Sequence, residues 1–278
     1  MPARLTKLQR AGKIKPRAAK SAIADPRKRL LRVIALLESN LGKPVWDGPK
    51  DALEVLVLTI LSQNTTDPNA LRAYQHLAAS LPAPPTGKKP QDLPRDAAGN
   101  VDKVKLRLSD AARAVQAPDW AKVAALAPKA LAELIRAAGL PQSKSASILG
   151  ALHWLREITG NYRLEDAIDA IGLAATMEGL TQIKGIGLKT ISVTLIEALG
   201  ADLCPVDTHV HRILNRLGVV DTGANRDRTY QQLKPLLPAG SAFALHHNLL
   251  TFGRTICQAK APQCSACVLR KLCPSRLA

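Results

Sequence analysis

Four cysteines near the end of the chain constrain the fold more than any other feature of the sequence. Cys257, Cys264, Cys267 and Cys273 follow a C-x6-C-x2-C-x5-C spacing. Four thiolates this close in sequence can surround one metal centre, and the C-x-x-C pair would supply two of the ligands from a single turn. Zinc held by four thiolates and a 4Fe–4S cluster both fit this spacing, which does not choose between them.

Two disulfide bonds are the alternative use of the four cysteines. The N-terminal segment has no apolar core of the kind that a secretory signal carries, so we expect the chain to remain in a reducing compartment. A metal centre is therefore the favoured interpretation. The fifth cysteine, Cys204, is expected to be a small buried apolar residue.

The rest of the chain has the periodicity of α-helices and no convincing strand alternation, which predicts an all-α fold. Apolar residues recur at helical spacing in segments 131–138, 191–199 and 210–217, and a glycine follows each segment. Segment 52–62 is apolar nearly all round, which favours a helix inside a bundle, although its β-branched residues also fit a strand. A stretch rich in Pro, Asp and Lys at about 82–119 predicts a surface insertion.

The charge of the chain is strongly positive. It carries 39 Lys and Arg against 22 Asp and Glu, a formal net charge of +17, which attracts polyanions such as nucleic acid or acidic lipid. Cations crowd the N-terminus, and residues 1–25 are predicted to form a disordered basic arm, with an organelle transit peptide as the alternative. No apolar run reaches membrane-spanning length, so we expect no membrane association.

The stretch "IKGIGLKT", residues 183–190, places a G-x-G turn between two helical segments. Glycine at 185 and 187 would let a ligand approach the backbone closely, and the first amides of the following helix could bind a phosphodiester. A plain helix–helix connection is the alternative for an isolated G-x-G.

Two residues that could take part in a chemical reaction, Lys189 and Asp207, lie on either side of the helical segment 191–199. Lys189 follows the glycines, and Asp207 and Thr208 precede the helix of segment 210–217, where both are good helix caps. An unprotonated lysine amine can also form a Schiff base with a sugar C1′. A nearby carboxylate could take the proton of the lysine and stabilise the positive charge that develops on the sugar.

Together these motifs resemble the endonuclease III family of DNA repair enzymes, within the helix–hairpin–helix glycosylase superfamily. The similarity runs from about residue 45 to Cys273 and is interrupted by the Pro-rich insertion and near 161–177. The segments that carry it are "ILSQNTTD", "LIRAAGLPQSKS", "LTQIKGIGLKT", "VDTHVHRILNRLG" and "LHHNLLTFGRTIC" leading into the cysteines. These motifs occur in the family's order and at similar spacing, which makes the set specific.

The resemblance implies two helical domains with a DNA groove between them. Residues 45–201 would form a six-helix barrel that contains the hairpin of Gly185 and Gly187, which would clamp a phosphate. Residues 26–44 and 202–278 would form a second domain that holds a 4Fe–4S cluster on the four cysteines, mainly as a structural element. Lys260, in the loop between the first two cysteines, would contact DNA phosphate.

The resemblance also implies base excision DNA repair by a bifunctional N-glycosylase and AP lyase. The enzyme would flip a damaged base out of double-stranded DNA. Lys189, activated by Asp207, would displace the base, and β-elimination would then cut the strand at the abasic site. Typical family substrates are oxidised or saturated pyrimidines such as thymine glycol.

The two upstream motifs match the segments that open the duplex in this family. Leu140 matches a residue that wedges into the base stack, and Asn64 or Gln63 matches the residue that fills the gap left by the extruded base. Family members commonly carry Gln at the gap, whereas the aligned residue here is Asn64.

Two alternative functions remain open. A monofunctional glycosylase of the same superfamily is disfavoured by Lys189, which such enzymes lack, and a weakly active or non-catalytic DNA-binding relative is disfavoured by the presence of both Lys189 and Asp207. We expect a monomer that acts on double-stranded DNA with a damaged base or abasic site. It would reside in a bacterial-type cytoplasm beside the nucleoid, or in an organelle or nucleus if the source is eukaryotic.

Overall fold

The computed structural model of the 278-residue chain describes residues 25–48, 50–84 and 116–277. Within these ranges the chain forms α-helices and short 3-10 helices and contains no β-strand, so the all-α prediction is confirmed. The predicted basic arm, apart from Asp25, and most of the predicted insertion lie outside the described residues. No helix in the described part is long and apolar enough to span a bilayer.

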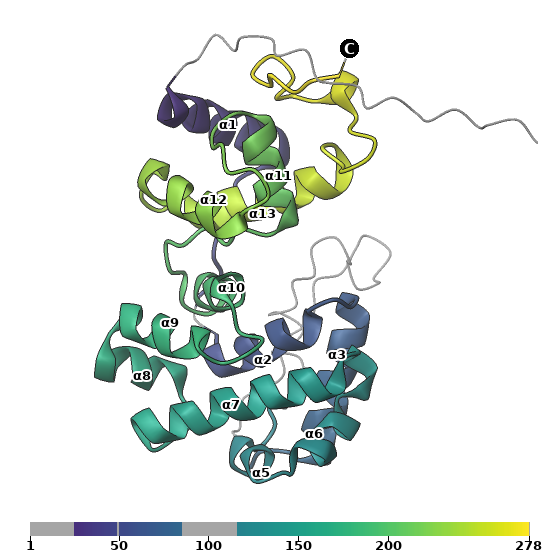
Figure 1. Ribbon diagram of the computed structural model, residues 1–278, viewed down its shortest axis with the longest axis vertical. Coiled ribbons are helices and arrows are strands. Elements are labelled where there is room, and N and C mark those ends of the chain that lie inside the picture. The colour runs from purple at the N-terminus through teal and green to yellow at the C-terminus, as the bar shows by residue number, and fades with distance from the viewer. Residues whose placement is uncertain (1–24, 49, 85–115, 278) are drawn as a thin grey trace, which may run out of the picture.

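The helices follow one another along the chain as shown in Figure 1. In order they are α1 (Pro26–Leu41), α2 (Ala52–Ser62), α3 (Asp67–Ser80), α5 (Trp120–Ala124), α6 (Pro128–Leu134), η1 (Arg136–Ala138), α7 (Pro141–Thr159), α8 (Leu164–Ile171), α9 (Leu173–Thr181), α10 (Leu188–Leu199), α11 (Thr208–Arg216), α12 (Arg226–Leu233), η2 (Lys234–Leu236), α13 (Ala242–Thr255) and η3 (Cys264–Ala266).

These helices gather into two groups, each with its own apolar core. Helices α2, α3 and α5 to α9 form the lower group in Figure 1, and α1, α11, α12 and α13 form the upper group with the C-terminal loop. Helix α10 lies between the groups and contributes to both cores: Ile191 and Leu195 pack in the lower core and Ile196 packs in the upper one. The domain boundaries implied by the resemblance stay a prediction.

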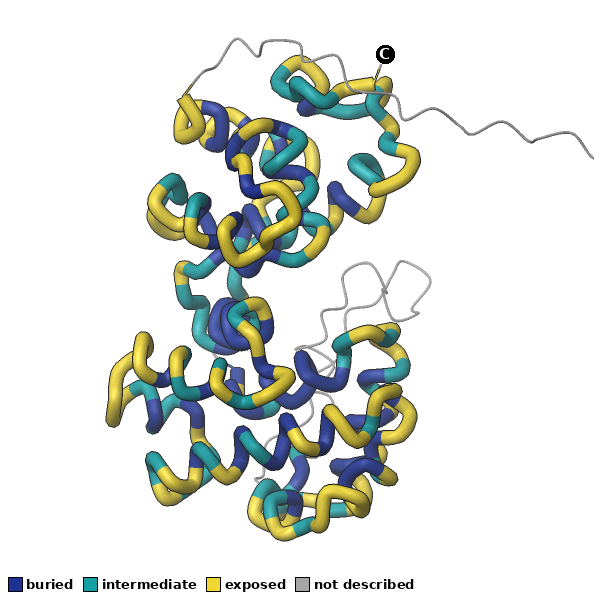
Figure 2. Tube along the Cα trace, viewed as in Figure 1, coloured by how far each residue is buried: buried dark blue, intermediate teal, exposed yellow. Residues whose placement is uncertain are grey.

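The apolar segment 52–62 is a helix, and the alternative strand interpretation is excluded. Helix α2 packs against α10, α3, α7 and α8, so partners surround it on all sides and nine of its eleven residues are buried. Figure 2 shows α2 and α10 as mostly buried segments in the middle of the molecule. A helix enclosed in this way needs no polar face, which explains its nearly uniform apolar sequence.

Helix formation in segment 131–138 is interrupted, which differs from the prediction. Helix α6 ends at Leu134, and the tighter η1 follows before Gly139. The backbone amide of Ala138 donates to Ile135 O, while the ring nitrogen Nδ1 of His76 lies 2.8 Å from Leu134 O and donates to it. A side chain from α3 therefore takes the carbonyl that a continuous α-helix would have used.

The two ends of the predicted insertion lie side by side. Asp119 N donates to Leu81 O at 2.7 Å, and Ala83 N donates to Ala117 O at 3.0 Å. Pro82 and Pro118 form an isolated antiparallel bridge between these bonds. The chain therefore leaves the helical core and returns to it at one point. The shorter interruption, 161–177, is mainly helical: it contains α8 and the first half of α9.

Candidate active site

The glycine turn connects α9 to α10 and is fixed from two sides. Gly185 has φ +93°, and a Cβ at this position would overlap the hydroxyl of Ser147 on α7, so the fold accepts only glycine here. The side-chain amide of Gln63 donates to Gly185 O at 2.9 Å and to Thr190 Oγ1 at 3.1 Å. The end of α2 therefore holds both the turn and the first turn of α10.

Gly187 differs from Gly185 because nothing inside the protein requires a glycine there. Its φ is −95°, which any residue adopts, and a Cβ would meet no atom within 4 Å. Gly187 instead lines an open cleft. Its missing side chain leaves room for a molecule that approaches the backbone from outside the protein.

This cleft has a volume of about 970 Å³, and the starts of three helices reach its wall. The start of α10 has no side-chain cap, so its first backbone N–H groups and the positive end of its helix dipole favour an anionic ligand. The starts of α11 and α12 are capped by Asp207 and Asn225. The cleft is lined by Gln63, Asn64, Gly187, Leu188, Lys189, Thr190, Val206, Asp207, Thr208, Ala224, Asn225, Arg226 and Asp227, which come from the end of α2 and the starts of α10, α11 and α12.

Lys189 lies in the first turn of α10 and points to the shared cleft. Its side chain keeps solvent access on the open side, yet the surrounding cleft walls desolvate its ammonium, and this lowers the pKa of Lys189 below the ordinary lysine value. The carboxylates of Asp207 and Asp67 oppose this change, and the cations of Arg226 and Arg254 add to it. The environment therefore increases the fraction of neutral amine at a given pH.

Asp207 is both a helix cap and a wall of the cleft. Its Oδ1 accepts the backbone N–H groups of His209 at 2.9 Å and Val210 at 2.8 Å, which caps α11. These two bonds hold the carboxylate in place, and its charge acts on Lys189 across the cleft. The capping interpretation and the chemical interpretation are therefore compatible in one side chain.

The two residues expected to probe the duplex share an unusual backbone. Asn64 has φ +52° and Leu140 has φ +50°, and no other non-glycine residue in the described part of the chain has a positive φ. Such conformations are costly for side chains and concentrate at functional sites. Asn64 lines the cleft, whereas Leu140 starts α7 outside the cleft lining, with 57% of its surface exposed.

The four cysteines line one cavity of about 190 Å³ at the other end of α11. Arg216 Nη1 donates to Cys257 Sγ at 3.3 Å, and burial raises the pKa of the Cys267 and Cys273 thiols. In the described residues no three His, Cys, Asp or Glu side chains converge on a single metal ion. Cys204 lies apart from this site, buried in the upper core as expected.

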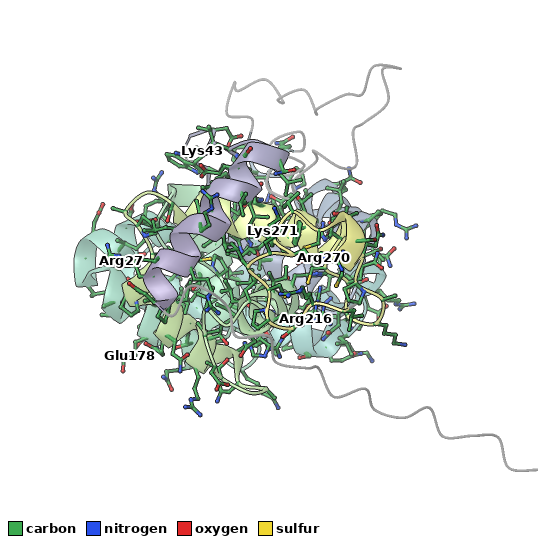
Figure 3. The ribbon with its side chains drawn as sticks, turned by 90° about the horizontal axis from the view of Figure 1, so that it is seen from above. Arg27, Lys43, Glu178, Arg216, Arg270 and Lys271 are labelled. Carbon is green, nitrogen blue, oxygen red and sulfur yellow. The ribbon has the colours of Figure 1, made fainter. Side chains whose placement is uncertain are left out.

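A cationic surface surrounds the cysteine cavity. Arg216, Lys260, Arg270 and Arg276 line the cavity. Figure 3 views the molecule from above and labels Arg216, Arg270 and Lys271, together with Arg27 at the start of α1 and Lys43 just beyond its end. The predicted phosphate contact Lys260 is exposed and borders this cavity, not the cleft of Lys189.

Comparison with known proteins assigns the chain to a family. The sequence profile described as "HhH-GPD superfamily base excision DNA repair protein" matches residues 57–239, which is more than half of the chain. The chain belongs to the HhH-GPD superfamily of base excision DNA repair proteins. The resemblance to the endonuclease III family is confirmed by relatives of that name, and the chain is a base excision repair DNA glycosylase.

The relatives cover most of this HhH-GPD protein. Endonuclease III of Sulfolobus acidocaldarius is 27% identical over 224 residues, which covers 81% of this chain and 82% of the relative. Endonuclease III of Thermotoga maritima is 29% identical over 223 residues, which covers 80% and 83%. A solved structure of a trapped endonuclease III–DNA covalent intermediate has the same fold, with a TM-score of 0.62, 20% identity and coverage of 89% and 95%.

Sequence reasoning missed the start of α12 as part of the cleft. Asn225 caps this helix by accepting from Arg228 N at 2.9 Å, a short-range pattern that the sequence does indicate. That pattern is local to α12 and does not indicate that Arg226 and Asp227 line the same cleft as Lys189, which belongs to a different helix. The charge on Arg226 nevertheless helps to lower the pKa of Lys189.

We predict that charge substitutions around the cleft move the pKa of Lys189 in opposite directions. Arg226→Gln removes a cation that disfavours a second positive charge, so the pKa should rise; Asp67→Asn removes an anion that favours the ammonium, so it should fall. Titration of ¹³C-dimethylated lysines by NMR gives the midpoint. Arg228→Gln, on the same helix but outside the cleft lining, is the matched control. Shifts in the same direction for both substitutions would contradict the prediction.

Proposed function

We propose that this glycosylase is bifunctional: it removes a damaged base and then cuts the DNA strand at the resulting abasic site. The arrangement of Lys189 and Asp207 carries the proposal. Lys189 lies in the first turn of α10 and Asp207 caps the start of α11, they line one cleft, and Lys189 has a lowered pKa. An amine nucleophile needs this partial loss of its proton, and a carboxylate beside it can serve as the proton acceptor.

The first half of the reaction replaces the base with the lysine. The neutral amine of Lys189 attacks C1′ of the sugar and forms a C–N bond, while the bond from C1′ to the base breaks and the base leaves with the bonding electrons. Positive charge develops on the sugar during this step, and the carboxylate of Asp207 stabilises it. Asp207 then accepts a proton from the substituted ammonium and passes it to O4′ as the C1′–O4′ bond breaks. The sugar ring thereby opens, and the nitrogen lone pair forms a protonated imine to C1′.

The second half of the reaction breaks the strand. The imine acidifies the protons on C2′, one of which is removed, and the electrons of that C–H bond expel the 3′ phosphate from C3′. The products are a 5′-phosphorylated end and an unsaturated aldehyde that water releases from Lys189. The same lysine therefore serves both steps, and the positions of the amine and the carboxylate need not change between them.

The start of α10 supports a phosphate site at the cleft. Gly187 presents open backbone beside the unpaired amides of α10, and the fold does not need a glycine there. We propose that a phosphate near the lesion docks against this turn, as at other helix N-termini. The net charge of +17 would add sequence-independent attraction to the duplex.

The proposed substrates are oxidised or saturated pyrimidines in double-stranded DNA. The support is the similarity to proteins named endonuclease III. We propose that Leu140, exposed at the start of α7, enters the base stack and that Asn64 fills the space left by the extruded base. The amide of Gln63 is already used to hold the glycine turn, which supports Asn64 for this role. The protein is proposed to act as a monomer.

We propose that the cysteine cavity holds a 4Fe–4S cluster. All four thiols line one cavity, whose volume of about 190 Å³ exceeds the space that a single ion needs, and the donor set of four thiolates suits such a cluster. The cluster would supply a covalent crosslink among the four cysteines. Arg212 donates to Cys257 O and Arg216 to Gln258 O, both at 2.8 Å, so α11 already holds this loop from its other side.

Borohydride should trap the wild-type protein on duplex DNA that contains an abasic site, because reduction of the imine gives a stable bond to Lys189. Lys189→Gln should abolish the adduct. Asp207→Asn keeps the helix cap, since Asn is a good cap, and should slow trapping by about 10²–10⁴-fold. Gel shift under denaturing conditions measures the adduct. A monofunctional glycosylase or a non-catalytic relative gives no adduct, and an adduct that survives Lys189→Gln would exclude this residue as the nucleophile.

The cluster proposal predicts a brown protein with about four iron atoms per chain. Cys264→Ser should lower the iron content and the broad visible absorbance together, while Cys204→Ser, at the buried cysteine outside the cavity, should leave both unchanged. Iron is measured by elemental analysis of protein purified without oxygen. Stoichiometric zinc in a colourless protein would refute the proposal.

The phosphate site at the glycine turn can be tested by adding one methyl group. Gly187→Ala should leave the melting temperature unchanged, because its Cβ meets nothing inside the fold, and should weaken duplex binding by obstructing the approach of a phosphate. Gly185→Ala should lower the melting temperature, because of its φ of +93° and the overlap with Ser147. Thermal melts and fluorescence anisotropy measure the two properties. Unchanged binding by Gly187→Ala would mean that no phosphate docks there.

A further inference from the structure

A buried lysine outside the cleft connects the ends of the two helices that precede Asn64 and Leu140. Lys144 lies in the first turns of α7 and is only 2% exposed. Its ammonium donates to Leu61 O and to Ala138 O, each at 2.7 Å. Within the described part of the chain no carboxylate lies within ion-pair distance of it, and burial lowers its pKa. Lys144 is thus held by backbone carbonyls.

These two carbonyls mark the ends of two helices. Leu61 O belongs to the last turn of α2, three residues before Asn64, and Ala138 O ends η1, two residues before Leu140. Carbonyls at the end of a helix have no partner within the helix, and Lys144 supplies one to each. The side chain of Lys144 therefore fixes the relative positions of the two helix ends that lead into the left-handed residues Asn64 and Leu140.

The chemistry of lysine suits this task. An ammonium carries three N–H donors at the end of a flexible stem and can reach carbonyls from two different segments at once. Burying a charge is costly unless its hydrogen bonds are made, so both carbonyls must stay near the ammonium. The contact thus resists movement of one loop without the other.

We propose that Lys144 is a positioning residue for base extrusion: it keeps the wedge residue Leu140 and the gap residue Asn64 in register, so that the duplex is opened and filled in one movement. This rests on the proposed function of the cleft. Lys144 does not line the cleft of Lys189, and its effect should therefore be confined to substrates that still carry a base. An abasic site has no base to extrude, so imine formation there should depend much less on the register of the two loops.

The test compares two substrates with one protein preparation. Lys144→Met keeps the length of the side chain and removes the donors, and Lys129→Met, at an exposed lysine on α6, is the matched control. Single-turnover release of thymine glycol from a duplex should slow by about 10–100-fold in Lys144→Met, the scale expected for misplacement by about 1 Å. Borohydride trapping on the same duplex with an abasic site should stay within about twofold of wild type.

A double-substitution cycle separates positioning from general support of the fold. If Lys144 acts through the wedge residue Leu140, Lys144→Met should slow the release of thymine glycol less in a Leu140→Ala background than in the wild type, because the wedge is already lost. Lys144→Gln keeps two N–H donors on a shorter side chain and should give a smaller loss of the same kind. If Lys144→Met unfolds below the assay temperature, Lys144→Gln is used in its place in both assays.

Each result supports or overturns the proposal. Equal slowing on the two substrates, or additive effects with Leu140→Ala, would show that Lys144 only supports the fold. Unchanged release of thymine glycol would show that the two loops keep their register without it. Wild-type protein that fails to trap on abasic DNA would instead refute the proposed lyase function, and with it the premise of this role.

Discussion

The packing of α10 into two cores is the interaction on which the rest of the structure depends. Ile191 and Leu195 contact the lower core and Ile196 contacts the upper one, so neither helical group can form its final surface without this helix. The contact is strengthened at its end, where the indole of Trp46 donates to Glu197 O at 3.0 Å and Lys50 N donates to Ala198 O at 2.8 Å. Because Lys189 begins the same helix, the placement of the nucleophile follows from the packing of the whole molecule.

Much of the site could be predicted because its signals are local. The spacing of the four cysteines indicated one site, and all four line one cavity. The helix after Asp207 could be predicted from a cap followed by apolar residues at helical spacing, and the structure shows both the cap and the helix. In the glycine turn the residue types indicated a close backbone approach, but they did not distinguish Gly185, which the fold requires, from Gly187, which it does not.

The parts that could not be predicted depend on contacts between distant segments. Lys144 and Leu61 are separated by 83 positions, and a lysine in a helical pattern usually indicates a solvent-exposed face. Arg226 reaches the cleft only because α12 packs beside α11, which no periodicity reveals. The break after Leu134 likewise depends on His76 from another helix. Local propensity describes each helix, whereas these residues acquire their surroundings from the arrangement of the helices.

The paired ends of the insertion have a consequence for how this protein can vary. Backbone bonds of Leu81, Ala83, Ala117 and Asp119 join the outgoing and returning chain, and the side-chain amide of Gln116 adds a bond to Ala83 O. Both ends of the insertion are therefore fixed on the helical core. The entropy of closing a loop between fixed ends grows only slowly with its length. The sequence between these ends can therefore be lengthened, shortened or exchanged, in evolution or by design, without moving the helices that position Lys189 and Asp207.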